Sequence, residues 1–351
     1  MQTVKQVVGI DVAQKELVVC LGRMYEDWSP SLFASKNFAN TAKGFETLLA
    51  WVSKMTDPAR ELRFVMEATG VYHEKLAYHL SAKGINLSVI LPSKISNYAR
   101  TLQVKTVNDK TASEAIAMFG LERKLDNWTP PLPIYKQLRQ LTRERDQVIV
   151  ERTGIKNQLH AEQSEADPGA SSIARMKKRI VLLVSQELQI RAEIQGLLKE
   201  DEQLRQTVKR LCTMPGVGIL TAVTVLAETN GFELIRNKRQ LTSYAGLDVT
   251  EKQSGTSVRG KSRISKRGNK YLRKALHMPA LSLLRSNERY KAIFARLVCR
   301  HGIKMKAAVA IQRKMLEMIY TLHKTKADYD PQYLNKKIES NHEGHSLHRL
   351  A

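Results

Sequence analysis

A change of hydrophobic period divides this 351-residue chain at a proline-rich segment, residues 128–133. Before the segment, short apolar runs alternate with stretches of helical period, a pattern typical of an α/β sheet. After it, apolar residues recur in steps of three and four, which is typical of packed helices. Three prolines in four positions cannot lie inside a helix, so the segment is interpreted as a linker.

Two of the strands expected in the first part end in acidic residues. The apolar run at residues 7–12 carries Asp11 near its end, and the run at residues 63–67 ends in Glu67. If these strands are neighbours in one sheet, both carboxylates emerge at the same edge, where a cation would relieve their repulsion. Further strands are expected at residues 16–21, 31–38 and 87–91.

A third acid, Asp109, begins a stretch of helical period. Residues three apart share a face of a helix, so position 112 lies on the face of Asp109, whereas Glu114 points elsewhere. A second interpretation stays open, in which Asp109 is only a helix N-cap and Asp11 and Glu67 are solvated strand ends.

The second part begins with two apolar heptad seams, residues 134–159 and 173–211, separated by Asp-Pro-Gly. They predict either a long antiparallel helical hairpin or an oligomerising coiled coil. Charges at seam positions destabilise the helices unless they are paired, so Arg145 or Arg152 is expected to face Glu187. The charged residues at seam positions are Arg145, Arg152, Glu187 and Asp201.

The net charge of +23 is concentrated in the second part. Residues 1–131 carry 16 basic and 13 acidic side chains, and residues 132–351 carry 41 and 21. Such a field attracts phosphate backbones or anionic lipid. No apolar stretch approaches the roughly 18–20 residues of a membrane span, and residues 1–9 lack the parts of a signal peptide. A cytoplasmic protein that binds nucleic acid and no membrane is therefore expected.

The cysteines and the C-terminal histidines are assigned no metal site. The cysteines have no metal-ligand spacing and are interpreted as buried reduced thiols. The histidines lie in a polar segment without period, which favours a frayed tail over metal binding. These residues are Cys20, Cys212, Cys299, His342, His345 and His348.

Basic residues are densest between residues 236 and 274, with 12 basic and 2 acidic side chains. Glycines and serines punctuate this stretch, which suits phosphate contact by side chains and backbone N–H groups. Upstream, Pro215-Gly216-Val217-Gly218 resembles the hairpin of helix-hairpin-helix DNA binders, although a plain turn between helices explains it as well. The expected nucleic-acid contacts are Arg259, Lys261, Arg263, Lys266, Arg267, Lys270 and Arg273.

Together, Gly9-Ile10-Asp11, residues 67–70, the Asp109 helix, residues 215–218 and residues 253–268 resemble the DEDD transposases of bacterial insertion sequences, in the IS110 group and its IS1111 branch. The resemblance covers residues 5–325. It implies an α/β ribonuclease-H-like (RuvC-like) domain at 1–131, a coiled-coil helical hairpin at 132–210, a mostly α-helical transposase domain at 211–325 and a flexible tail at 326–351.

The resemblance also implies an RNA-guided DNA recombinase. In such enzymes a bridge RNA pairs with target and donor double-stranded DNA, and a serine forms a phosphoserine link to the cut strand. Asp11, Glu67 and Asp109 match three of the four family acids that bind Mg²⁺, and Ser254 matches the nucleophile. A nucleoid-associated homo-oligomer, a dimer or tetramer, is expected. Because the acids and the serine lie in different domains, a composite site assembled between two subunits is an attractive interpretation.

Position 112 departs from the family pattern, because Ala112 stands where the fourth acid belongs. A methyl group cannot coordinate magnesium, so the sequence predicts impaired metal binding and little strand cleavage, in an engineered variant or a naturally decayed copy. Two alternatives stay open. One is a metal-dependent junction nuclease that uses water, with Ser254 as a phosphate ligand. The other is a non-catalytic assembly protein that binds RNA and DNA.

Overall fold

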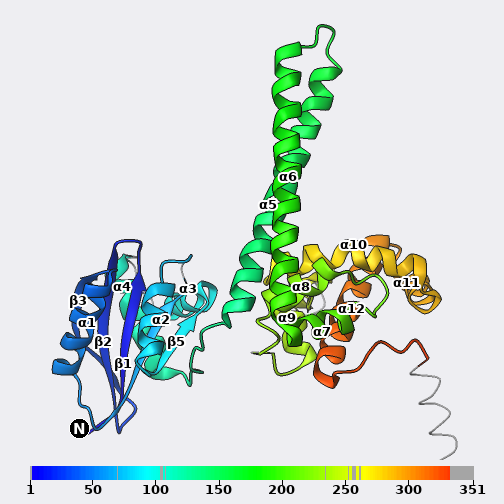
Figure 1. The fold of residues 1–351 in the computed structure, drawn as a ribbon. Coiled ribbons are helices and arrows are strands. Elements are labelled where there is room, and N and C mark those ends of the chain that lie inside the picture. Colours follow the sequence, from blue (N-terminus) through cyan, green and yellow to red (C-terminus); the bar gives the residue numbers. More distant parts are fainter. Residues whose placement is uncertain are drawn as a thin grey trace, which may run out of the picture. The chain divides into compact units, whose positions relative to one another are not determined.

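The computed structural model describes residues 2–68, 70–102, 106, 108–233, 235–251, 253–254, 258–260 and 262–332. The chain forms two compact units, Met1–Pro130 and Pro131–Ala351, and the boundary between them falls inside the proline-rich segment (Figure 1). The helical hairpin belongs to the second unit. No helix in the described ranges is both long and apolar enough to cross a membrane.

The first unit is built on a five-stranded mixed sheet in the order β3-β2-β1-β4-β5. Strands β1, β2 and β3 form an antiparallel meander, β4 runs parallel to β1, and β5 runs parallel to β4. The α/β prediction is confirmed by this mixed sheet and the helices that cover it. The strands are β1 (Thr3–Val12), β2 (Glu16–Tyr25), β3 (Pro30–Ala39), β4 (Glu61–Glu67) and β5 (Leu87–Ile90).

Helices cover the sheet because its central strands are apolar on both faces. Val8, Ile10 and Phe64 belong to one core cluster, which includes Leu48 of α1 and Leu76 of α2. A second cluster joins the other face of the sheet to α4 and α3. The helices are α1 (Ala42–Met55), α2 (Glu74–Ala82), α3 (Pro92–Ala99), the short 3₁₀ turn η1 (Arg100–Leu102) and α4 (Asp109–Glu122).

Helix α4 lies directly against β1 at Gly9. A Cβ atom at Gly9 would collide with the backbone of Ala117 and with the carbonyl of Ser113. Only glycine permits this close approach of helix to strand. The first turn of α4 is thereby brought toward the end of β1 that carries Asp11.

The second unit begins with a hairpin of two 31-residue helices, α5 (Pro133–Gln163) and α6 (Ala170–Glu200), which lie side by side in Figure 1. Leu138, Val148 and Ile155 of α5 and Ile190 and Ile194 of α6 are buried in the core of this unit. Pro133 occupies the first turn of α5, where its missing N–H costs nothing.

The expected ion pairing in the hairpin is confirmed and involves both arginines. Arg145 and Arg152 contact the two carboxylate oxygens of Glu187 at 2.8 and 2.5 Å. Burial by itself raises the pKa of Glu187, but hydrogen bonds from Arg152 and Arg145 outweigh it, and the net pKa lies below the usual value.

Asp201 corrects the continuous seam expected through residue 211. It ends α6 and caps α7 (Glu202–Leu211), with its carboxylate accepting a hydrogen bond from Leu204 N at 2.9 Å. A short acidic side chain at this position satisfies a free N–H of the next helix instead of pairing across the hairpin.

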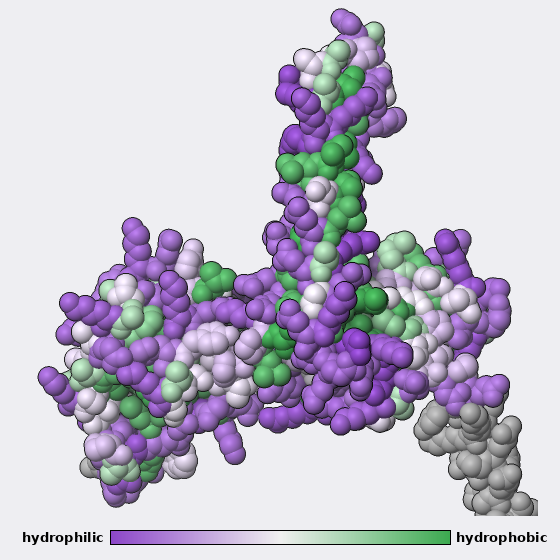
Figure 2. Space-filling model, viewed as in Figure 1, coloured by the Kyte–Doolittle hydropathy of each residue, from purple (hydrophilic) through white to green (hydrophobic). Residues whose placement is uncertain are grey.

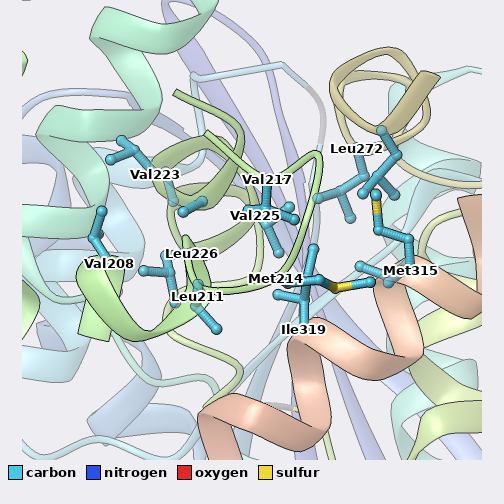
Figure 3. Close-up of a cluster of buried hydrophobic side chains, with 14 of the residues drawn as sticks. Val208, Leu211, Met214, Val217, Val223, Val225, Leu226, Leu272, Met315 and Ile319 are labelled. Atoms are coloured by element: carbon cyan, nitrogen blue, oxygen red, sulfur yellow. The ribbon is translucent and has the colours of Figure 1, made fainter. Parts of the chain in front are cut away.

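The remaining helices surround one apolar core. Figure 3 shows Met214 and Val217, from the turn after α7, packing near Leu272 of α10 and Met315 of α12. The helices are α8 (Ile219–Glu228), α9 (Lys238–Tyr244), α10 (Lys270–Ser286), α11 (Glu288–His301) and α12 (Lys304–Thr325).

Four short strands interrupt this helical unit between α9 and α10. β6 pairs with β9 and β7 pairs with β8, both antiparallel. We call the segment 249–264, which carries these strands, the serine arm. The glycines and β-branched residues of this stretch have no helical period, which accounts for the exception to the mostly helical prediction. The strands are β6 (Val249–Thr250), β7 (Gln253–Ser254), β8 (Val258–Arg259) and β9 (Arg263–Ile264).

The three cysteines differ in burial. Cys20 is buried and Cys212 is half-buried, as expected for structural thiols, but Cys299 on α11 is exposed and corrects that expectation. Few side chains of α11 face the core, and Tyr290 is its only buried residue in the described structure. His342, His345 and His348 lie outside the described residues.

Candidate functional site

Asp11 and Glu67 lie on the same face of the sheet, at the carboxyl ends of neighbouring parallel strands. The register pairs Gly9 of β1 with Val65 of β4, and side chains two residues further along each strand point to the same side. Gly9 faces α4. Asp109 is the first residue of α4. We call the three side chains of Asp11, Glu67 and Asp109 the acid face.

The three carboxylates interact electrostatically. The pKa of Asp11 is raised, first by burial and then by the negative charges of Asp109 and Glu67. A neighbouring negative charge disfavours ionisation of a carboxyl group and so raises its pKa. Asp11 is half-buried and senses the charges of the two other acids that the sequence singled out. A shared site of the three carboxylates stays a prediction.

Asp109 is not the N-cap of α4. That role belongs to Asn108, whose side chain accepts a hydrogen bond from Thr111 N at 2.9 Å, while the Thr111 hydroxyl accepts one from Asn108 N at 2.9 Å. Asp109 is exposed in the first turn, where a carboxylate also interacts favourably with the helix dipole. Its side chain is thus left for the acid face.

Ala112 leaves the acid face incomplete. It follows Asp109 by one helical turn and contributes only a methyl group. Carboxylate oxygens are suitable ligands for a hard divalent cation. Yet nowhere in the described chain are three Asp, Glu, His or Cys side chains grouped closely enough to hold a metal ion. The residues present therefore do not fit a bound divalent cation as they stand.

Glu114 lies apart from the acid face, as the helical spacing predicts. Its charge acts on Cys20 instead: burial first and Glu114 second raise the pKa of that thiol to about 12. A thiol with so high a pKa stays protonated at neutral pH, so Cys20 is a packing residue with no nucleophilic character.

Ser254 lies in the second compact unit, on β7 of the serine arm, where it pairs with Val258 of β8. Its side chain, the Arg259 side chain and the whole of Lys261 lie outside the described structure.

The described basic residues in the arm and just after it fall into two groups. Arg263, Lys266, Arg267 and Lys270 are exposed, as expected of phosphate contacts. Arg273 is half-buried, and its Nη1 donates to two backbone carbonyls at the base of the arm. Arg273 thus supports the arm through its own contacts within the protein.

The sequence reading missed a buried acid in this unit, Glu228. It ends the apolar run of α8, which is the same signal that drew attention to Asp11 and Glu67. Its partners, Arg143 and Asn269, are 85 and 41 residues away in the chain, and no local pattern marks them.

Two family models match the chain. A model for the DEDD transposases of IS110 matches residues 8–163, which include the acid face, and one described as "Transposase IS116/IS110/IS902 family" matches residues 208–295, which include the serine arm.

Similar proteins extend over most of the chain. The pilin gene-inverting protein of Moraxella bovis is 28% identical over 333 residues, covering 93% of this chain and 98% of its own length. The transposase for insertion sequence element IS1111A of Coxiella burnetii is 25% identical over 269 residues, 68% of this chain and 71% of that protein. Among solved structures, Thermus thermophilus RuvC matches 35% of this chain and 99% of its own, with 12% identity and a TM-score of 0.28.

Proposed function

The chain belongs to the IS116/IS110/IS902 family of transposases, and we propose that it is a bridge-RNA-guided DNA recombinase whose cutting step is impaired by Ala112. The observation that carries the proposal is the acid face: Asp11 and Glu67 end neighbouring parallel strands on the side of the sheet that α4 covers, and Asp109 begins α4. Burial, and then the charges of Asp109 and Glu67, raise the pKa of Asp11. A transposase needs such a site to act on phosphodiesters.

Ser254 is the proposed nucleophile. Its hydroxyl oxygen attacks the phosphorus of a DNA phosphodiester, and the bond from phosphorus to the leaving deoxyribose oxygen breaks. The serine proton leaves to solvent and the departing oxygen gains one. The phosphoserine ester conserves the energy of the broken bond, so a hydroxyl of another strand can displace the serine without external energy. The exposed cations beside the arm support this role because they can hold the DNA backbone.

The proposed partners are a bridge RNA and two DNA duplexes, target and donor, with Mg²⁺ as the cation in members that have all four acids. Base specificity would come from RNA pairing, so few side chains need to read base edges. A homo-oligomer is proposed because apolar side chains remain exposed along the hairpin, among them Val181 and Leu188 at 69% and 60% (Figure 2). Exposed apolar patches of this kind mark association surfaces.

The test restores the missing acid with Ala112→Asp. We expect MgCl₂ to raise the melting temperature of this variant more than it raises that of the chain with Ala112. With the RNA encoded beside its gene and target DNA, it should form a denaturation-resistant protein–DNA adduct. No gain in either measurement would remove position 112 from the metal site.

The matched control is Ser254→Ala in the Ala112→Asp background. It should keep the magnesium effect and lose the adduct. An adduct that persists in this double variant would contradict the assignment of Ser254. DNA cleavage without any adduct would favour a metal-dependent junction nuclease that uses water.

A second candidate is a non-catalytic assembly protein that binds RNA and DNA. Ala112 favours it, because a methyl group stands where the fourth family acid belongs, and so does the basic charge of the second part. Strand exchange gained by Ala112→Asp would count against this candidate, whereas RNA and DNA binding without any gain of chemistry would favour it.

A further inference from the structure

Glu228 is a buried carboxylate whose side chain is 1% exposed. Burying a charge destabilises the fold unless the charge is paired and hydrogen-bonded. Arg143 of α5 binds it through two parallel hydrogen bonds, from Nε at 2.7 Å and Nη2 at 2.8 Å. Asn269 adds a third, from Nδ2 at 2.6 Å. Glu228 therefore joins the first helix of the hairpin to the start of α10.

Asn269 is fixed at both ends of its side-chain amide. Its Oδ1 caps α10 by accepting from Tyr271 N and Leu272 N at 2.9 and 3.1 Å, while its Nδ2 is bound to Glu228. Its backbone N–H donates to the Tyr244 carbonyl at 2.8 Å. The Tyr244 hydroxyl in turn donates to the backbone carbonyl of Glu228 at 2.8 Å.

The stem of the serine arm begins directly after Tyr244 in the sequence and ends directly before Asn269. It consists of residues 245–248 and 265–268, and Ser265 joins them by donating its backbone N–H at 2.8 Å and its hydroxyl at 2.5 Å to Asp248. Nη1 of Arg273 donates to one backbone carbonyl on each side of the stem, at 2.9 and 3.1 Å. The position of the arm therefore follows the position of Asn269.

Helix α5 holds this region by two further contacts. The Arg143 guanidinium lies over the ring of Tyr271, 4.5 Å from its centroid. One turn along, Asp146 forms an ion pair with Lys274 of α10. Both contacts reach the first turns of α10, next to the stem.

We propose that Arg143, Glu228 and Asn269 are positioning residues that tie the serine arm to the hairpin. Displacement of α5 is transmitted through the Glu228 carboxylate to Asn269 and so to both sides of the stem. The proposal rests on the proposed role of Ser254 for its functional meaning, but the mechanical link can be measured without any catalysis.

The chain offers a matched control in Glu187. Like Glu228, it is a buried carboxylate bound by arginines of α5, at Arg145 and Arg152. It lies on α6, and its recorded partners all belong to the hairpin. Loss of its charge weakens the hairpin without touching the stem.

The experiment measures hydrogen–deuterium exchange of the stem amides in the full chain. The variants are Glu228→Gln, Asn269→Ser and Glu187→Gln. Asn269→Ser is the sharper test, because serine is also a good N-cap for α10, but its shorter side chain lacks the amide Nδ2 that binds Glu228. We expect exchange in residues 245–248 and 265–269 to become at least about tenfold faster in Glu228→Gln and Asn269→Ser, and to stay unchanged in Glu187→Gln.

A second measurement separates positioning from binding. In the Ala112→Asp background, Glu228→Gln and Asn269→Ser should slow adduct formation about tenfold or more while the DNA dissociation constant stays within about twofold. Glu187→Gln should match its parent in both.

Unchanged stem exchange in a folded Asn269→Ser protein would overturn the proposal, even if Glu228→Gln fails to fold. Equally fast stem exchange in Glu187→Gln would also overturn it, because the faster exchange would then reflect a general loss of stability in the unit. If the Ala112→Asp parent itself forms no adduct, the proposed function fails, and the exchange measurement still decides the link between hairpin and arm.

Discussion

Asp11 gives the first unit a pH dependence of defined sign. Burial, Asp109 and Glu67 raise its pKa, so the folded chain binds this proton more readily than the unfolded chain. Stability from Asp11 protonation is present at low pH and is lost as the pH rises from the ordinary aspartate pKa through the raised one. We therefore expect Asp11→Asn to raise the melting temperature at pH 7 and to have little effect below the ordinary aspartate pKa.

Tryptophan fluorescence is suited to this measurement, because Trp28, Trp51 and Trp128 all lie in the first unit. Asp27→Asn serves as the control. Asp27 is exposed, and hydrogen bonds from Ser29 lower its pKa, so its neutralisation should bring no gain. A melting temperature of Asp11→Asn equal to the parent at pH 7 would contradict repulsion within the acid face.

At the residue scale, the sequence predicted the features that depend only on nearby residues in the chain. An apolar run that ends in an acid led to Asp11 and Glu67, and helical spacing separated Glu114 from Asp109. The same signal at Glu228 was not recognised, because its meaning depends on Arg143 and Asn269, which are distant in the chain. Contacts of that separation are set by packing, which no local pattern records.

The hairpin is stabilised by one buried ion-pair cluster among its apolar residues. Removing one partner of such a cluster leaves uncompensated buried charge. Glu187→Ala would remove the carboxylate that both Arg145 and Arg152 bind and leave the two positive charges near each other. We expect it to lower the free energy of unfolding by about 3–5 kcal/mol, as found for broken buried pairs. Urea denaturation followed by circular dichroism measures the change.

The comparison variant is Glu151→Ala, which breaks the exposed pair with Arg179, where both side chains are more than half exposed. Pairs of that kind contribute about 0–1 kcal/mol. Similar losses in the two variants would mean that the Glu187 cluster has no special weight. Because hydrogen bonds from the arginines lower the Glu187 pKa, its contribution should be fully present above the ordinary glutamate pKa. It should be lost as the pH falls from that value through the lowered pKa of the folded chain.

At the element scale, long periodic segments were predictable and short ones were not. The heptad pattern located the hairpin and its charged cluster, but it ran through Asp201, since an acid at a seam position and an acid that caps a helix look alike in sequence. The strands of the serine arm are two residues each, too short to establish a period of two.

Nucleic-acid binding should depend steeply on salt, because most of the positive charge lies in residues 132–351. Each phosphate contact that is lost lowers the slope of log K against log salt by about 0.9 on duplex DNA. We expect Arg263→Gln with Arg267→Gln to lower the slope by about 1.8. Fluorescence anisotropy over a series of NaCl concentrations measures this change.

Lys43→Gln with Lys54→Gln removes the same charge from α1 of the first unit and is the control. Its slope should change much less, because these lysines are not proposed contacts. Equal changes in the two double variants would show that overall charge, and not the arm, governs binding.

At the scale of the whole molecule, the sequence predicted a nearly neutral α/β part and a strongly basic helical part. The guide RNA and the serine chemistry followed only from the family resemblance, because no charge pattern distinguishes RNA from DNA as the bound polyanion. The gap at position 112 could be recognised only from the helical spacing and the family resemblance together. Ala112 is an ordinary helix residue unless an acid is expected three residues after Asp109.

The length of α5 gives the hairpin a mechanical property. Its 31 residues span about 46 Å, and Arg143, ten residues from its start, lies about 15 Å along it. For rotation about the first residue, a 3 Å displacement of the far tip moves Arg143 by about 1 Å. With that pivot, the hairpin would act as a lever with about threefold reduction, and a displacement of its tip would reach the Arg143–Glu228 contact as a smaller shift.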